Sequence, residues 1–181
     1  MKQQIQKILR HYKKKESTGE NLRASAVLIP LFYNQGQYYV LFTKRSEEVD
    51  FHKGEVCFPG GTREPSDSSL LQTALRESEE EIGLEAKDIE ILGELDDILT
   101  FVTNYVISPF VAFIPYPQSL RTNGREVKGT FFVPLSFLMD EANFKQDSYA
   151  YEYEGHIIWG ATARILRQFI DLLKSESGAL Q

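Results

Sequence analysis

A short helix crowded with carboxylates constrains this chain more than any other feature. Residues 76–84 read Arg-Glu-Ser-Glu-Glu-Glu-Ile-Gly-Leu, and the glycine is expected to end the helix. At 3.6 residues per turn, Glu77, Glu80 and Glu81 share one helical face. The opposite face is expected to point inward and carries Leu71, Leu75, Ser78 and Ile82. The fold must therefore bury one side of an otherwise acidic helix.

The acidic face costs the helix stability. Like charges three or four residues apart repel, and anions near a helix C-terminus oppose the macrodipole, each at about 0.3–1 kcal/mol. A hard divalent cation such as Mg²⁺ or Mn²⁺ would compensate, because it prefers clustered carboxylate oxygens. A solvated acidic face is the alternative in a chain of net charge −6. Taken alone, the helix does not decide between these two interpretations.

The composition limits the class of protein. With 181 residues, of which 42% are hydrophobic and 25% charged, the chain fits one compact domain. The negative net charge argues against a nucleic-acid partner held by phosphate contacts. A single cysteine, Cys57, excludes an intramolecular disulfide and fits a reducing compartment. Because no long apolar run or signal-peptide core is present, we predict a cytoplasmic protein without stable membrane association.

The hydrophobic pattern predicts an α/β fold in which a mixed β-sheet is sandwiched between α-helices. Residues 1–22 form a separate N-terminal unit, an amphipathic helix over 2–14 and a linker, and residues 23–181 form the main domain. We expect this helix to dock on its own domain or on a partner. The acidic helix is expected to be capped by Ser66 or Asp67 and to run to about Ile82.

The remaining predicted elements alternate between strands and short helices. Strands are expected at 24–32, 38–43, 89–95, 105–114 and 127–133, and a short strand or extended loop at 54–61. A short helix near 136–140, a hairpin around 154–155 and a final helix over 161–174 complete the pattern.

The acidic helix and the loop before it resemble the Nudix box. Gly61 is followed six positions later by Asp67, and the second half of the box then matches at Arg76, Glu77, Glu80, Glu81, Gly83 and Leu84. Asp67 stands where glutamate is usual, and Ser78 occupies a hydrophobic position. The spacing from Gly61 to Arg76 is one residue longer than in the general pattern. This resemblance makes a solvated acidic face the weaker interpretation.

The longer spacing is similar to that of the coenzyme A pyrophosphatase branch of the Nudix family. A second signature of this branch lies upstream and matches at Leu41, Thr43, Arg45, Ser46, Gly54, Phe58, Pro59, Gly60 and Gly61. Phe42 replaces a leucine, and Asp50 replaces an arginine. The reversed charge at Asp50 bears on the choice of substrate. The resemblance covers residues 24–170 and implies a Nudix fold.

The resemblance implies a Mg²⁺- or Mn²⁺-dependent pyrophosphohydrolase whose partner is a small molecule linked to a nucleoside diphosphate. The leading substrate is coenzyme A or its thioesters, cleaved to 3′,5′-ADP and (acyl-)phosphopantetheine. A second hypothesis keeps the chemistry and changes the substrate to ADP-ribose, a dinucleotide or a nucleotide sugar. A third is a noncatalytic nucleotide-binding module, against which the intact glutamates argue. The sequence leaves the oligomeric state open, a homodimer included.

The resemblance also implies roles for individual acids. Glu77, Glu80 and Glu81 are the expected metal ligands. One of them, Glu80 in our assignment, or the loop acid Glu126 is expected to position or deprotonate the water that attacks the diphosphate. Rival loop acids for that role are Glu94, Asp96 and Asp97.

Other residues are expected to organise the site or to meet the substrate. Arg76 has planar donors that could hold the glutamates from behind. Lys44 and Arg45 end a predicted strand and could meet substrate phosphates, although an exposed strand end also explains them. Gly60 and Gly61 let backbone approach the metal or a phosphate, or only form a turn.

Overall fold

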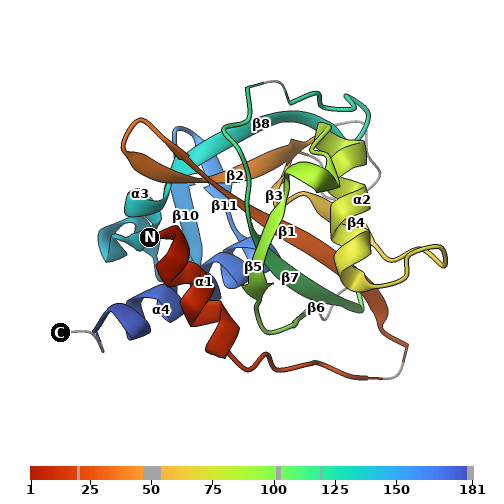
Figure 1. Ribbon diagram of the computed structural model, residues 1–181, viewed down its shortest axis with the longest axis horizontal. Helices are drawn as coiled ribbons and strands as arrows, with labels where there is room; N and C mark the ends of the chain where they lie inside the picture. Colours follow the sequence, from red (N-terminus) through yellow and green to blue (C-terminus); the bar gives the residue numbers. More distant parts are fainter. Residues whose placement is uncertain (20, 47–53, 101–102, 119, 179–181) are drawn as a thin grey trace.

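The computed structural model describes residues 1–19, 21–46, 54–100, 103–118 and 120–178. Its helices are α1 (Lys2–His11), α2 (Leu70–Ile82), α3 (Leu135–Met139) and α4 (Gly160–Gly178), with short 3₁₀ turns η1 (Ala86–Asp88) and η2 (Glu141–Asn143). Its strands are β1 (Arg23–Asn34), β2 (Gln37–Arg45), β3 (Val56–Cys57), β4 (Gly60–Thr62), β5 (Glu90–Glu94), β6 (Ile98–Thr100), β7 (Tyr105–Phe113), β8 (Val127–Pro134), β9 (Phe144–Lys145), β10 (Ala150–Tyr153) and β11 (His156–Ile158). Figure 1 shows their arrangement.

The main sheet is mixed, as predicted. Its central path runs β3-β2-β1-β7-β5, with β4 on β1, β6 on β7 and β8 on β2. β1 and β7 are parallel, whereas β1 pairs with β2 in an antiparallel hairpin. A separate small sheet has the order β11-β10-β9.

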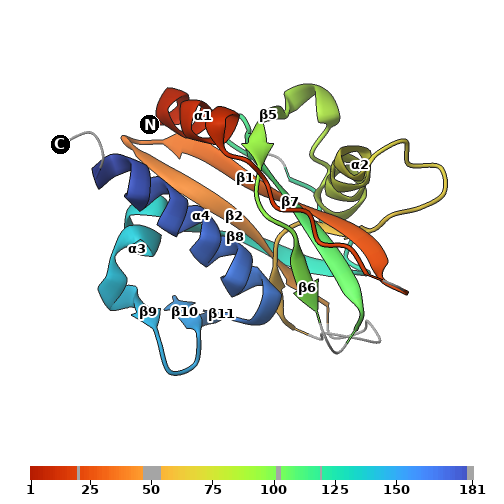
Figure 2. The same cartoon turned by 90° about the horizontal axis from the view of Figure 1, so that it is seen from below.

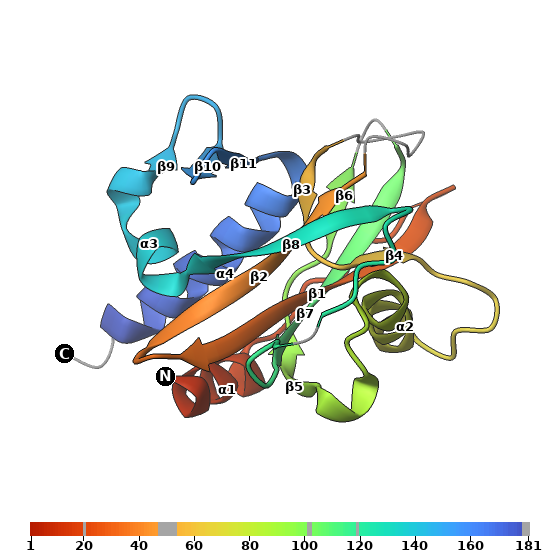
Figure 3. The same ribbon diagram turned by 90° about the horizontal axis from the view of Figure 1, so that it is seen from above.

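Both faces of the main sheet are covered, which explains why its central strands are apolar almost throughout. Along β1, Leu28 and Phe32 belong to one buried cluster with α2, while Ile29 and Leu31 belong to the other with α1 and α4. This alternation is the period of two expected of a strand. In Figures 2 and 3, α2 and α4 lie on opposite sides of the sheet. The predicted sheet between helices is confirmed.

The N-terminal helix packs on this chain's own body. Ile5 and Leu9 are only 1% and 4% exposed and join the cluster that contains α4. The helix ends at His11, earlier than residue 14, because the following residues run extended along the acids that precede β6. Of its two expected docking surfaces, the structure shows the one on its own domain.

One local prediction needs correction, and some short strands were not predicted. The N-cap of α2 is Ser69, whose hydroxyl accepts a hydrogen bond from Gln72 N at 3.1 Å, and not Ser66 or Asp67. The sequence pattern also missed β6, since three residues are too few to display a periodicity. The C-terminal glycine of the helix is confirmed, because Gly83 has the left-handed φ of 70°.

Among the described residues, no helix combines the length and the apolar character that a membrane span requires.

Candidate metal centre

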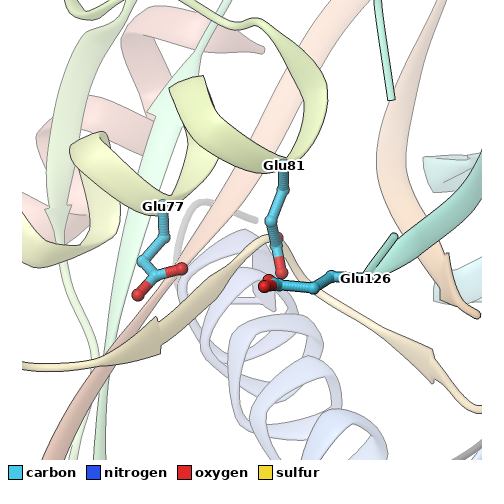
Figure 4. A group of neighbouring side chains, drawn as sticks. All are labelled: Glu77, Glu81 and Glu126. Carbon is cyan, nitrogen blue, oxygen red and sulfur yellow. The ribbon is translucent and has the colours of Figure 1, made fainter. Parts of the chain in front are cut away.

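Three carboxylates from two parts of the chain converge beside α2. Glu77 and Glu81 come from the helix, and Glu126 comes from the residue just before β8 (Figure 4). One oxygen of each lies within 4.8 Å of the other two, and no other such group of three or more occurs among the described residues. Glu81 is buried, Glu77 is half-buried and Glu126 is exposed. The cluster is therefore open to solvent on the Glu126 side.

The helix directs two of these acids to the same side. Glu77 and Glu81 are four residues apart, so that their side chains lie one above the other. The helix face that packs on the sheet includes Ala74 and Ile82, both fully buried. Ser78, which departs from the hydrophobic residue of the box, is also buried and donates a hydrogen bond to Ala74 O at 2.7 Å. Its hydroxyl is thus satisfied inside the helix, and the departure does not disturb the site.

The glycine pair holds the two helical acids at close range. Gly60 N donates a hydrogen bond to Glu81 Oε2 at 3.1 Å. A Cβ at Gly60, where φ is 151°, would lie 2.2 Å from Ala26 O, so this position requires glycine. A Cβ at Gly61 would lie 2.4 Å from Glu77 Oε1. Gly60 therefore binds the carboxylate of Glu81, and the missing side chain at Gly61 leaves room for the carboxylate of Glu77.

Burial makes the negative charge of the cluster costly. It raises the pKa of Glu81 to about 8, an effect that the Gly60 N–H opposes and the charge of Glu77 increases. Burial also raises the pKa of Glu77, and there the guanidinium of Arg76 opposes the shift. A divalent cation would offset these penalties, because it adds positive charge where carboxylate oxygens already converge. The donor set fits a hard cation such as Mg²⁺ or Mn²⁺.

Arg76 connects the acids of α2 with the loop before the helix. Its Nε and Nη2 donate to the two oxygens of Asp67 at 3.0 and 3.1 Å, and Nη2 lies 3.1 Å from Glu77 Oε1. Nη1 donates to Glu80 Oε2 at 3.1 Å. Asp67 also accepts from Thr73 Oγ1 and is 3% exposed, and the bond from Arg76 holds the pKa of Asp67 well below its usual range. The structure gives Arg76 contacts that suit the predicted organising role.

The predicted ligand Glu80 lies outside the cluster of three. Its side chain is 58% exposed and is paired with Arg76. To reach the other carboxylates it would have to leave that guanidinium, so its role as a ligand or base stays a prediction. Glu126, the predicted loop acid, is brought to the cluster instead.

The three rival loop acids bind the N-terminal segment. Lys14 Nζ lies 3.1 Å from both Glu94 Oε2 and Asp97 Oδ1. Asp96 accepts a hydrogen bond from Lys15 N at 2.7 Å. These contacts give Glu94, Asp96 and Asp97 a structural function in holding the N-terminal segment, away from the cluster of Glu77, Glu81 and Glu126.

The two predicted basic residues lie at the end of β2. Arg45 pairs in register with Val127, the residue after Glu126. Its Nε is buried and has no hydrogen-bond partner among the described residues, and its charge is near enough to lower the pKa of Glu81. Lys44 is half-buried beside it. Asp50, the reversed charge noted in the sequence, lies outside the described residues.

Comparisons with known proteins bear on the family to which the chain belongs. A model of the NUDIX domain matches residues 22–152. The uncharacterized Nudix hydrolase NudL of Photorhabdus laumondii is 36% identical over 159 residues, which cover 82% of this chain and 84% of that protein. The peroxisomal coenzyme A diphosphatase NUDT7 of Mus musculus is 40% identical over 114 residues, 63% of this chain and 48% of that protein. The crystal structure of a C. elegans Ap4A hydrolase binary complex has a TM-score of 0.59 at 16% identity, covering 85% of this chain and 99% of that chain, which supports the fold alone.

Proposed function

The chain belongs to the Nudix family, whose hydrolases act on diphosphate bonds, and we propose that it cleaves coenzyme A or its thioesters in a Mg²⁺- or Mn²⁺-dependent reaction. The products are 3′,5′-ADP and (acyl-)phosphopantetheine. The single observation that carries the metal-dependent hydrolysis is the convergence of Glu77, Glu81 and Glu126 within 4.8 Å.

We assign the three converging acids to the ion. A bound divalent cation neutralises phosphate oxygens and makes a coordinated water more acidic. Gly60 N–H fixes the carboxylate of Glu81, and Arg76 fixes that of Glu77 from behind. We further propose that Glu126, which is exposed at the open side, accepts the proton of the attacking water through the oxygen that does not face the ion. Glu80 remains a predicted ligand that would join after leaving Arg76.

Cations at the end of β2 are proposed to hold the substrate. The buried Nε of Arg45 has no hydrogen-bond partner among the described residues, and a phosphate oxygen would satisfy it with a charge-assisted bond. Lys44 adds a second positive charge at the same strand end. Arg45, whose charge acts on Glu81, would give the negatively charged diphosphate a positive flank beside the carboxylates.

The choice of coenzyme A rests on the sequence signature and on a relative. The upstream motif that ends in Gly60-Gly61 resembles the coenzyme A branch, and a coenzyme A diphosphatase of Mus musculus is 40% identical over 114 residues. Because Asp50 replaces the arginine of that motif, ADP-ribose, dinucleotides and nucleotide sugars remain the second candidate class of substrate. A noncatalytic module would have no need for a buried, costly carboxylate such as Glu81.

A substrate panel tests the proposal. Purified protein with Mg²⁺ is incubated with coenzyme A, acetyl-coenzyme A, NADH, ADP-ribose and nucleotide sugars, and the products are separated by chromatography. We expect kcat/KM for the coenzyme A compounds to exceed the others at least about tenfold, with 3′,5′-ADP as a product and no turnover in EDTA. If the protein prefers another compound of the panel, that compound replaces coenzyme A as the proposed substrate. No turnover of any member would contradict the catalytic function.

A further inference from the structure

The segment that carries Glu126 is attached to the last turn of the acidic helix. Arg121 N donates a hydrogen bond to Ile82 O at 3.0 Å, and Asn123 N donates to Glu81 O at 3.0 Å. Carbonyls in the last turn of a helix lack partners within the helix, so these two donors satisfy groups that would otherwise need water. The backbone of Asn123 is therefore fixed to the residue that supplies a buried carboxylate of the cluster.

The side chain of Asn123 closes the turn that follows. Its Oδ1 accepts hydrogen bonds from Glu126 N at 3.0 Å and from Val127 N at 3.2 Å. Gly124, the residue after Asn123, has a left-handed φ of 67°, which lets the chain reverse its direction within a few residues. Val127 is fully buried and begins β8. One residue thus links the carbonyl of Glu81 to the amide of Glu126.

We propose that Asn123 is a positioning residue that sets Glu126 against Glu77 and Glu81. The proposal rests on the function proposed above. The carboxylate of Glu126 is exposed, so its direction depends on where its backbone is held. That backbone is held on one side by Asn123 Oδ1 and on the other by Ser46 N, which donates to Glu126 O at 2.8 Å. Removing a residue that orients a metal ligand in this way typically lowers metal affinity or activity about 10- to 100-fold.

The test compares Asn123→Ala with wild type. Alanine keeps the backbone bond to Glu81 and removes only the acceptor, and because Asn123 is exposed we expect the variant to fold. We expect kcat to fall about tenfold with a smaller change in KM, and the affinity for Mn²⁺ alone, measured by calorimetry, to fall by a similar factor. Asn123→Ser, which restores an uncharged acceptor, is expected to recover part of both losses. Asp140→Ala is the matched control, since Asp140 Oδ1 accepts from Ala142 N in the same manner away from the site.

A double-mutant comparison separates positioning from a general structural effect. In a Glu126→Gln background, we expect Asn123→Ala to change kcat less than about twofold, because the acid that it positions is already disabled. An equal loss of kcat in both backgrounds, or wild-type kcat and Mn²⁺ affinity in Asn123→Ala, would overturn the inference. If wild type turns over no substrate, the proposed function fails, and the Mn²⁺ affinities still decide the role of Asn123.

Discussion

Replacing Glu81 with glutamine is expected to lower kcat at least ~10²-fold while the fold is retained. The substitution keeps the size of a side chain that is 1% exposed, and the amide oxygen can still accept the hydrogen bond from Gly60 N. It removes a negative charge from a cluster of three carboxylates, and with it one ligand for the cation. Steady-state kinetics at saturating Mg²⁺ measure the effect.

The same substitution is expected to stabilise the metal-free protein. Burial raises the pKa of Glu81 to about 8, above the ordinary glutamate value of about 4.3. An acid whose pKa is raised in the folded state destabilises the folded state increasingly as the pH rises between those two values. Glutamine does not titrate, so it avoids this loss of stability. Urea unfolding in EDTA at pH 8 should therefore give a higher free energy of unfolding for Glu81→Gln than for wild type, with no gain at pH 4.

Glu79→Gln is the matched control for Glu81→Gln. It removes the same charge from an exposed position on the same helix, and we expect activity close to wild type. Retained activity in Glu81→Gln would show that this carboxylate is not a required ligand. Equal losses in both variants would point to the net charge of the helix instead.

Asp67→Asn is expected to lower the free energy of unfolding by about 3 kcal/mol. The carboxylate is buried and accepts two bonds from Arg76 and one from Thr73 Oγ1. Asparagine has a single side-chain oxygen, so its amide NH₂ faces donors in a buried position and at least one guanidinium donor loses its acceptor there. Glu64→Gln removes an exposed acid 4.0 Å from the same guanidinium and should cost less than about 0.5 kcal/mol. Urea unfolding at pH 7 measures both.

The effect of Asp67→Asn should depend on pH. Arg76 lowers the pKa of Asp67 below the ordinary value of about 3.9. An acid whose pKa is lowered in the folded state stabilises the protein at pH values above its ordinary pKa. This stability is lost as the pH falls toward the folded-state pKa. The difference between wild type and Asp67→Asn should therefore be constant from pH 7 to about pH 5 and shrink below pH 4. A difference that does not change with pH would contradict the ion pair as its cause.

The sequence predicted the fold and the position of the acidic helix well because both depend on local patterns. The strand periodicity and the glycine at position 83 are short-range signals. The predicted N-cap was wrong because Ser66, Asp67 and Ser69 are all good capping residues. In the structure Asp67 is buried against Arg76, and the Ser69 hydroxyl accepts the hydrogen bond from Gln72 N.

The sequence could not tell which glutamates meet. On a helical wheel, Glu80 and Glu81 lie about 60° and 40° to opposite sides of Glu77. Only the side of Glu81 faces Gly60 and the loop that brings Glu126, while Glu80 meets Arg76 four residues before it. The contacts of Glu81 with Gly60 and with Glu126 join residues far apart in the chain, so helical spacing alone does not contain them. The turn signal Asn123-Gly124 was present in the sequence, but its link to Glu81 was visible only in the fold.

The measurement that tests the central claim most directly is the location of a bound cation. Crystals of the wild-type protein are soaked in Mn²⁺, and anomalous diffraction is recorded with and without a bound nucleotide. We expect an anomalous peak in coordination contact with Glu77, Glu81 and Glu126, and its loss in Glu81→Gln. No peak beside these carboxylates, even with nucleotide bound, would contradict the claim that this cluster holds the ion used for diphosphate hydrolysis.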